Sequence, residues 1–181
     1  MVETDSSVRI ARLGPSDLSA YKRLRDEALR LYPDAFDADL ESEQARPPES
    51  YLGRLGLTET LGGTFLLGAW SGAELVGMVG LERQALQKLR HSAELNSMMV
   101  RPSHTGRGIG IQLVQAAVAQ ARQALGLEVL TLRVSTSSPS AIRLYERAGF
   151  QGCGVVPHAI KLIDGPGRSR YFDKLTMVLV L

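Results

Sequence analysis

Gly106, Gly108 and Gly110 stand on alternate positions where an apolar segment gives way to an amphipathic one. Glycine leaves backbone N–H groups unobstructed and permits dihedral angles that a Cβ would forbid. The start of a helix adds unpaired N–H donors and a partial positive charge. The stretch "MMVRPSHTGRGIGIQLV" (98–114) therefore predicts an anion cradle that suits a phosphate group.

The glycine run differs from two common nucleotide-binding loops. A Walker loop needs a lysine and then a Ser or Thr directly after its last glycine, and no such lysine follows here. A dinucleotide fingerprint needs G-x-G-x-x-G directly after the first strand of a βαβ unit, whereas this run reads G-x-G-x-G and begins well beyond Val100. The pattern favours a different phosphate compound.

A second motif lies further along the chain. The segment "SPSAIRLYERAGF" (138–150) follows "VRPSHTGRGIG" (100–110) after a predicted helix and strand. Together they resemble the signature of the GNAT superfamily of acyl-coenzyme A dependent N-acetyltransferases, which reads V-x-P, then Q/R-x-x-G-x-G/A, then N-x-x-A-x-x-L-Y-x-x-x-G-F. The resemblance is close over residues 93–156, and the order of predicted elements extends it over the whole chain.

The resemblance implies acetyl-CoA as cosubstrate and assigns residues to it. The loop amides would hold the coenzyme pyrophosphate, and the edge of the preceding strand would pair with the pantetheine amides. The residues so assigned are Gly106, Arg107, Gly108, Ile109, Gly110 and Ile111 for the pyrophosphate, and Met98, Met99 and Val100 for pantetheine.

Two positions depart from the family pattern. Thr105 stands where Gln or Arg is usual, and its hydroxyl could still meet a phosphate. Ser138 stands where Asn is usual, and it could cap its helix or hydrogen-bond to the pantetheine arm. Both residues are therefore kept among the cofactor-binding candidates.

Acetyl transfer to an amine requires a deprotonated amine, a stabilised oxyanion and a proton for the leaving thiolate. By resemblance, Tyr145 is the acid that points at the coenzyme sulfur, and a backbone N–H near Met99 or Val100 meets the oxyanion. The alternative reading is that Leu144, Tyr145 and Phe150 pack the last helix against the sheet.

Glu94 is the candidate general base. Strand alternation predicts that it shares a face with Asn96, Met98 and Val100, and many family members use a carboxylate from this strand, usually through water. Glu82 and His91 are rival bases, and Glu94 could also be an ordinary solvated strand end. Arg133 stands where some relatives carry a carboxylate, which removes one further alternative.

Other reactive side chains carry weaker signals. Cys153 lies between two glycines, where a small thiol is more often packed than nucleophilic. The three histidines lack metal-ligand spacing, so no metal site is expected. The acidic segment from Asp34 to Glu49 could attract a cationic acceptor or could be a solvated loop, and the hairpin at 163–173 could form another wall of the acceptor cleft.

The elements that must position these residues alternate along the chain. Strands are predicted at 8–13, 64–70, 74–82, 93–100, 127–134, 150–156 and 172–181, and helices at 16–31, 48–57, 108–125 and 138–149. This order predicts an α/β fold with a mixed sheet and helices on both faces. The resemblance adds a mostly antiparallel, twisted sheet with one splayed parallel pair.

Length and composition set broader limits. The chain has 181 residues, which suits one N-acetyltransferase domain over 1–181, and its net charge of +2 gives no argument for nucleic acid. One cysteine excludes an internal disulfide, the polar start "MVETDSSVR" lacks a signal-peptide core, and the apolar runs are too short to span a bilayer. A cytoplasmic protein with no membrane partner is expected, and a homodimer is compatible with the resemblance.

The resemblance implies an enzyme that moves an acetyl group from acetyl-CoA to a primary amine by direct attack in a ternary complex. The acceptor would be a small molecule or a peptide. One alternative is a non-catalytic coenzyme A binding module, in which Thr105 and Ser138 mark a decayed site. Another is a nucleotide-binding regulator, which would bind ATP or NAD in place of coenzyme A.

Overall fold

A single seven-stranded sheet organises the chain. The computed structural model describes residues 8–181, so most of the polar N-terminal stretch lies outside the described residues. The sheet order is β1-β2-β3-β4-β5-β7-β6, and among the described strands only β4 and β5 run parallel. The strands are β1 (Arg9–Arg12), β2 (Phe65–Ser71), β3 (Glu74–Arg83), β4 (Ser92–Val100), β5 (Val129–Ser135), β6 (Gln151–Ile163) and β7 (Ser169–Val180).

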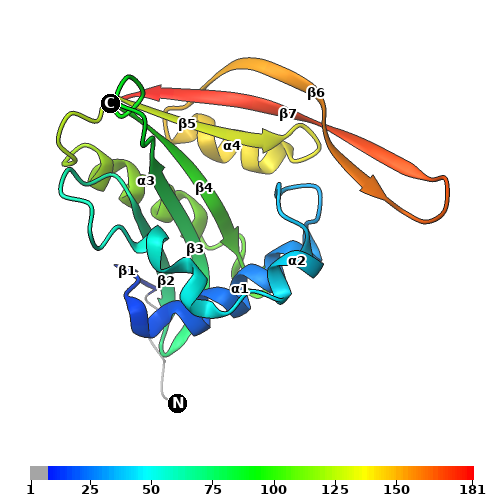
Figure 1. Ribbon diagram of the computed structural model, residues 1–181, viewed down its shortest axis with the longest axis horizontal. Helices are drawn as coiled ribbons and strands as arrows, with labels where there is room; N and C mark the ends of the chain where they lie inside the picture. Colours follow the sequence, from blue (N-terminus) through cyan, green and yellow to red (C-terminus); the bar gives the residue numbers. More distant parts are fainter. Residues whose placement is uncertain (1–7) are drawn as a thin grey trace.

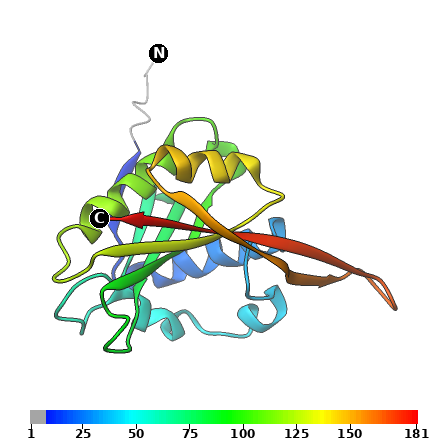
Figure 2. The same ribbon diagram turned by 90° about the horizontal axis from the view of Figure 1, so that it is seen from above.

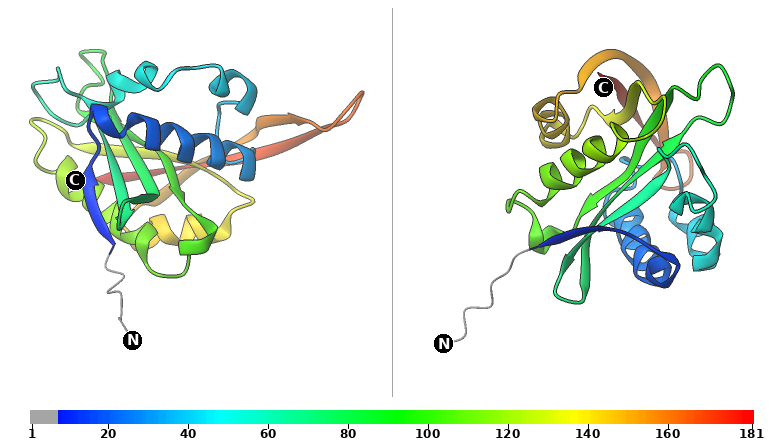
Figure 3. Two further views of the ribbon diagram at one scale, coloured as in Figure 1. Left: turned by 90° about the horizontal axis from the view of Figure 1, so that it is seen from below. Right: turned by 90° about the vertical axis from the view of Figure 1, so that its left-hand side faces the viewer.

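Helices cover both faces of this sheet (Figure 2 and Figure 3). One face carries α1 (Leu18–Leu31), α2 (Leu40–Gln44) and the 3-10 helix η2 (Pro48–Leu55). The other carries α3 (Ile109–Ala121) and α4 (Pro139–Arg147), and short 3-10 turns occupy η1 (Pro15–Asp17) and η3 (Pro102–His104). The predicted mixed α/β fold, with its parallel pair and two helical layers, is confirmed.

Each face has its own hydrophobic core. On α1, Leu18, Tyr21, Leu24 and Ala28 recur at spacings of three and four and are all buried against the sheet. On the opposite face, the apolar side of α3 packs onto the central strands in a second cluster that includes Tyr145. The central strands are therefore fixed from both sides.

Strands β4 and β5 separate soon after they meet (Figure 1). Their ladder pairs Ser92 with Val129, Ala93 with Leu130 and Glu94 with Thr131, and no later pair is formed among the described residues. Beyond Glu94 the inner edge of β4 therefore faces an opening and not a neighbouring strand.

A bulge in β4 corrects the predicted side-chain alternation. Ser97 has φ 53°, and it and Met98 together lie opposite one residue of β3. Glu94 points to the α1 side, where it meets Arg133, whereas Met98 and Val100 pack with the core on the α3 side. The expectation that Glu94 shares a face with Met98 and Val100 is wrong, because the extra residue reverses the alternation.

Two other segments differ from expectation. The region predicted as loop at 34–50 contains α2, which Asp39 caps by accepting a hydrogen bond from Ser42 N at 2.8 Å. Strands β6 and β7 are longer than predicted and run out together as an arm beyond the rest of the sheet (Figure 1). Residues 163–173 form the outer part of this arm.

Candidate active site

Two adjoining cavities lie at the opening between β4 and β5. The larger has a volume of about 390 Å³ and the smaller about 170 Å³. Phe36, Met98, Ser138 and Tyr145 line both of them, so they form two halves of one cleft. No residue of 163–173, the hairpin considered from sequence as a further wall of the acceptor cleft, lines either cavity.

The larger cavity gathers most of the residues predicted to bind the cofactor. It is lined from β4, from the turn that leads into α3, and from α4. The predicted residues in its lining are Met98, Met99, Val100, Thr105, Gly106, Ile109, Gly110, Ser138 and Tyr145. Arg107, Gly108 and Ile111 lie outside this lining, and Glu94 lines the smaller cavity.

The alternate glycines meet two different demands. Gly106 and Gly108 have φ of 76° and 75°, a region that side chains with a Cβ rarely adopt, and Gly108 is the N-cap of α3. Gly110 has ordinary helical geometry, but a Cβ there would lie 2.7 Å from Leu144 Cδ1. The first two glycines therefore shape the turn at the helix N-terminus, and the third permits α3 and α4 to approach.

Thr105 and Ser138, the two positions that depart from the family pattern, have different surroundings. Thr105 Oγ1 donates to Pro102 O at 2.9 Å, so its single hydroxyl hydrogen is used inside the turn and not offered to a phosphate. Ser138 is the N-cap of α4, yet its side chain makes no capping bond, which leaves the hydroxyl at the boundary of the two cavities. Arg107 is exposed on the same turn as Gly106.

Tyr145 both packs in the core and faces the cleft, so its position fits both roles that the sequence left open, packing and proton donation. It is buried, its ring packs edge-to-face on Phe150 with centroids 6.1 Å apart, and it also lines both cavities. Burial raises the pKa of Tyr145 above its ordinary value. The phenol is therefore in its protonated form at neutral pH and can donate a proton or a hydrogen bond.

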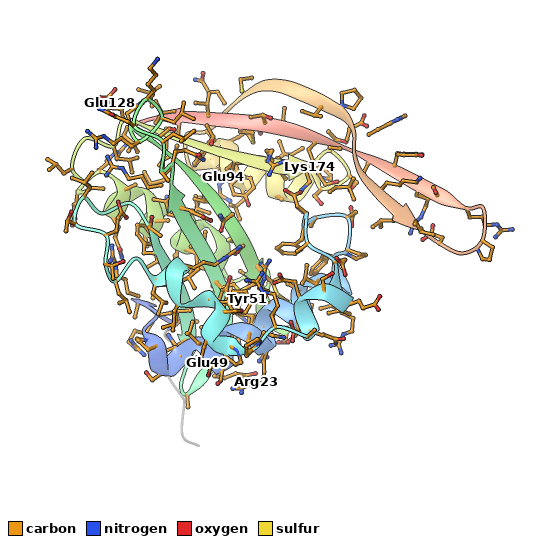
Figure 4. The ribbon with its side chains drawn as sticks, viewed as in Figure 1. Arg23, Glu49, Tyr51, Glu94, Glu128 and Lys174 are labelled. Atoms are coloured by element: carbon orange, nitrogen blue, oxygen red, sulfur yellow. The ribbon has the colours of Figure 1, made fainter. Side chains whose placement is uncertain are left out.

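Glu94 faces the smaller cavity within a chain of ionised groups. Its Oε1 lies 3.4 Å from Arg133 Nε, and Arg133 Nη2 donates to Asp37 Oδ2 at 2.6 Å. Lys174 Nζ donates to Asp37 Oδ1 at 2.5 Å. Figure 4 labels Glu94 on β4 and Lys174 on β7, which come from the two sides of the opening.

The segment from 32 to 39, between α1 and α2, reaches across the opening toward β5 (Figure 1). Asp34 Oδ2 accepts from Ser137 Oγ at 2.7 Å and from Ser135 Oγ at 3.4 Å. Phe36 lies between Asp34 and Asp37 in this segment and lines both cavities. We call residues 32–39 the bridging loop.

The bridging loop belongs to the acidic segment that was expected either to attract a cationic acceptor or to be a solvated loop, and its crossing of the opening was not predicted from sequence. The acidic residues of 34–49 looked available for a cationic acceptor, but Asp34, Asp37, Asp39 and Glu43 are all engaged by groups of this chain. Lys174, which lines the smaller cavity, and His104, which lines the larger cavity, were also missed. Lys174 stands directly after Asp173 in its strand, so the local sequence pattern does not mark it as a buried charge.

A buried polar network supports the bulge in β4. Ser97 Oγ accepts hydrogen bonds from Arg54 Nη1 at 2.9 Å and from Arg25 Nη1 at 3.3 Å. Arg25 Nε also donates to Glu43 Oε2 at 2.5 Å, and the Tyr51 hydroxyl donates to the same oxygen at 2.6 Å. Ser97 lines the smaller cavity, so this network fixes the floor of the cleft from the α1 side.

Among residues 8–181, no group of three or more His, Cys, Asp or Glu side chains is placed to hold a metal ion. None of the described helices combines the length and apolar character needed to cross a membrane.

A seven-stranded mixed sheet opened between β4 and β5, with a glycine turn at the mouth of the opening, defines a GNAT-type fold. The model of the family described as "Acetyltransferase (GNAT) family" matches residues 21–150. The chain therefore belongs to this family, as the two sequence motifs predicted.

Two known relatives match shorter segments of the chain. The L-methionine sulfoximine/L-methionine sulfone acetyltransferase of Pseudomonas aeruginosa is 37% identical over 86 residues, which is 48% of this chain and 46% of that protein. The N-alpha-acetyltransferase RimI of Mycobacterium tuberculosis is 35% identical over 89 residues, or 49% and 53%. The matched segments thus span about half the length of these relatives.

A solved structure matches nearly the whole chain. The yncA protein of Salmonella typhimurium, whose structure holds its cofactor acetyl-CoA, covers 97% of this chain and 94% of its own with a TM-score of 0.80. The sequence identity is 21%, so this likeness concerns the fold.

Proposed function

We propose that this protein is an acetyl-CoA dependent N-acetyltransferase that transfers the acetyl group to a primary amine by direct attack in a ternary complex. The observation that carries the proposal is the pair of adjoining cavities that share Tyr145. The glycine turn before α3 lines one cavity, and the carboxylates of Asp37 and Glu94 line the other. Membership of the GNAT family and the acetyl-CoA bound to a protein of the same fold support this assignment.

The larger cavity has the features that the coenzyme requires. The turn through Gly106 and Gly108 presents backbone N–H groups at the N-terminus of α3, where they and the helix dipole favour a pyrophosphate. Met98 to Val100 offer an unpaired strand edge toward the opening, which suits the pantetheine amides. Ser138 presents a hydroxyl without a capping role at the junction of the cavities.

The smaller cavity would hold the amine. Acetyl-CoA supplies the activated thioester, and Glu94 takes a proton from the acceptor ammonium directly or through water. A backbone N–H near Met99 or Val100 stabilises the developing oxyanion. Tyr145 donates its proton to the departing thiolate, a role that its raised pKa supports because the phenol stays protonated.

The test measures acetyl-CoA dependent release of free thiol with amino acids, polyamines, peptides and aminoglycosides as acceptors. Thermal shifts with acetyl-CoA, ATP and NAD are recorded beside it. Thiol release with one acceptor class, together with a shift by acetyl-CoA alone, is the expected result. A shift without release for any amine would favour the non-catalytic binding module, and a shift by ATP or NAD would favour a nucleotide-binding regulator.

A further inference from the structure

The smaller cavity has a balanced set of charges. Its lining contains two carboxylates, Asp37 and Glu94, and two cations, Arg133 and Lys174. A polyamine, which carries several positive charges, is attracted most by an acidic cavity, and a polyanion by a basic one. A cavity with both signs in equal number instead complements a molecule that carries one charge of each sign.

Two of these four groups, Asp37 and Lys174, form an ion pair with each other. Both oxygens of Asp37 accept hydrogen bonds, one from Lys174 and one from Arg133. Lys174 is buried and also lies 3.3 Å from Ala35 O, so its ammonium group is enclosed under the bridging loop. This pair fastens the loop and is not free to hold an acceptor.

The other two groups keep free hydrogen-bonding positions. Within residues 8–181, the contacts of Arg133 engage Nε and Nη2, which leaves the two hydrogens of Nη1. The contact of Glu94 with Arg133 involves Oε1 alone, at the long distance of 3.4 Å, which leaves Oε2. A guanidinium donor and a carboxylate acceptor therefore stand side by side on β5 and β4, just where the two strands part.

We propose that the acceptor is a free α-amino acid whose carboxylate is held by Arg133 while its amino group lies toward Glu94. This inference rests on the proposed acetyl transfer and names its acceptor class. An α-amino acid carries its carboxylate and its amine on one carbon, so it can meet two adjacent groups of opposite charge. Arginine suits the first task because its planar donors match a carboxylate.

The size of the cavity supports a small acceptor. Its volume of about 170 Å³ is below the range of roughly 300–1,000 Å³ typical of sites for drug-sized ligands. Ala35 and Phe36 of the bridging loop line it, which leaves less room for a continuing peptide chain. A peptide N-terminus also lacks the free α-carboxylate that Arg133 would bind.

The test compares free L-amino acids with their α-carboxamides, which keep the amine and side chain and lose the negative charge. Initial rates with acetyl-CoA are measured for wild type, Arg133→Gln, Asp37→Asn and the exposed control Arg122→Gln. For the best amino acid, wild type should show kcat/KM about tenfold or more above that of its carboxamide. Arg133→Gln should raise KM for the acid by about 10–100-fold and change KM for the carboxamide much less, so that the preference for the acid is lost.

The other variants separate recognition from loop fastening. Asp37→Asn weakens the fastening of the bridging loop but keeps the charge of Arg133, so the preference for the acid over the carboxamide should persist. If Arg133→Gln keeps the preference for the acid over the carboxamide, Arg133 does not bind the carboxylate and the inference is overturned. Arg122→Gln should behave as wild type.

Calorimetric binding of the amino acid in the presence of coenzyme A distinguishes this inference from the proposed function. Arg133-dependent binding without transfer to any amine would refute acetyl transfer and keep the amino-acid site. Faster transfer to carboxamides, spermidine or peptides than to amino acids would refute the amino-acid site and keep acetyl transfer. Absence of amino-acid binding in the ternary complex would also overturn the inference.

Discussion

Lys174 Nζ donates to Asp37 Oδ1 at 2.5 Å, and Lys174 is only 3% exposed. A buried ammonium group needs both an opposite charge and hydrogen-bond acceptors, and Asp37 with Ala35 O provides them from the bridging loop. Lys174 belongs to β7, so this ion pair ties the loop after α1 to the far side of the opened sheet. The same ion pair therefore buries Lys174 and holds the loop that lines the cleft.

The substitution Asp37→Asn removes the charge that compensates Lys174. We expect a loss of about 1–2 kcal/mol in the free energy of unfolding, less than for a fully buried pair because half of the Asp37 side chain is exposed. Amide hydrogen exchange within 32–39 should also become faster. Urea denaturation and exchange measurements test this, with the exposed neighbour Glu41→Gln as control. Equal stability of the two variants would mean that the pair does not fasten the loop.

Glu43 should contribute to the free energy of unfolding in a way that depends on pH. Burial alone would raise its pKa, but hydrogen bonds from Tyr51 and Arg25 lower it from 4.5 to about 2. A lowered folded-state pKa stabilises the fold at pH values above the unfolded pKa, by about 3 kcal/mol here, and this contribution is lost as the pH falls from about 5 toward 2.

Glu43→Gln should therefore be less stable than wild type by about 3 kcal/mol at pH 7, and the difference should shrink as the pH falls through that window. Urea denaturation at a series of pH values measures it, with exposed Glu49→Gln as the matched control. A difference that stays constant from pH 7 to pH 3 would show that the ionised form of Glu43 has no special role in stability.

The order of strands and helices could be predicted because it rests on periodicity and on two local motifs. The positions of Gly106 and Gly108 followed from the same logic, since a turn into a helix needs residues that tolerate positive φ. The face of Met98 could not be predicted, because the bulge at Ser97 depends on tertiary contacts with Arg25 and Arg54. Contacts between distant segments, such as Asp37 with Lys174, leave no mark on local periodicity.

Tyr145→Phe removes the proposed proton donor and keeps the ring that packs on Phe150. We expect kcat to fall by about 10²–10⁴-fold with little change in the affinity for acetyl-CoA or in melting temperature. Because burial raises the pKa of Tyr145, its ionisation should not reduce the wild-type rate between about pH 8 and 10. Steady-state kinetics and calorimetry test this, and an unchanged kcat would remove Tyr145 as the acid.

Gly108→Val places a β-branched side chain at φ 75° in the turn before α3. The turn must change its conformation, so we expect acetyl-CoA binding to be abolished in calorimetry. Gly53→Ala is the control, because its Cβ would meet nothing within 4 Å and its φ is ordinary. Retained coenzyme affinity in a folded Gly108→Val protein, judged by circular dichroism, would contradict the assignment of this turn.

Glu94 and Glu82 lie opposite each other on β4 and β3, so they provide a matched pair for identifying the general base. Glu94 lines the smaller cavity, whereas Glu82 lines a separate hollow beside η2. Glu94→Gln should lower kcat by about 10²–10⁴-fold near neutral pH, and Glu82→Gln should leave it close to wild type.

The pH dependence makes the role of Glu94 specific. Without a base, only acceptor molecules that are already deprotonated can react, so the rate of Glu94→Gln should rise about tenfold per pH unit until the pH reaches the pKa of the acceptor amine. A variant that is slow but has the pH profile of wild type would show that Glu94 positions the acceptor through Arg133 and removes no proton. A large loss in Glu82→Gln alone would transfer the role of base to Glu82.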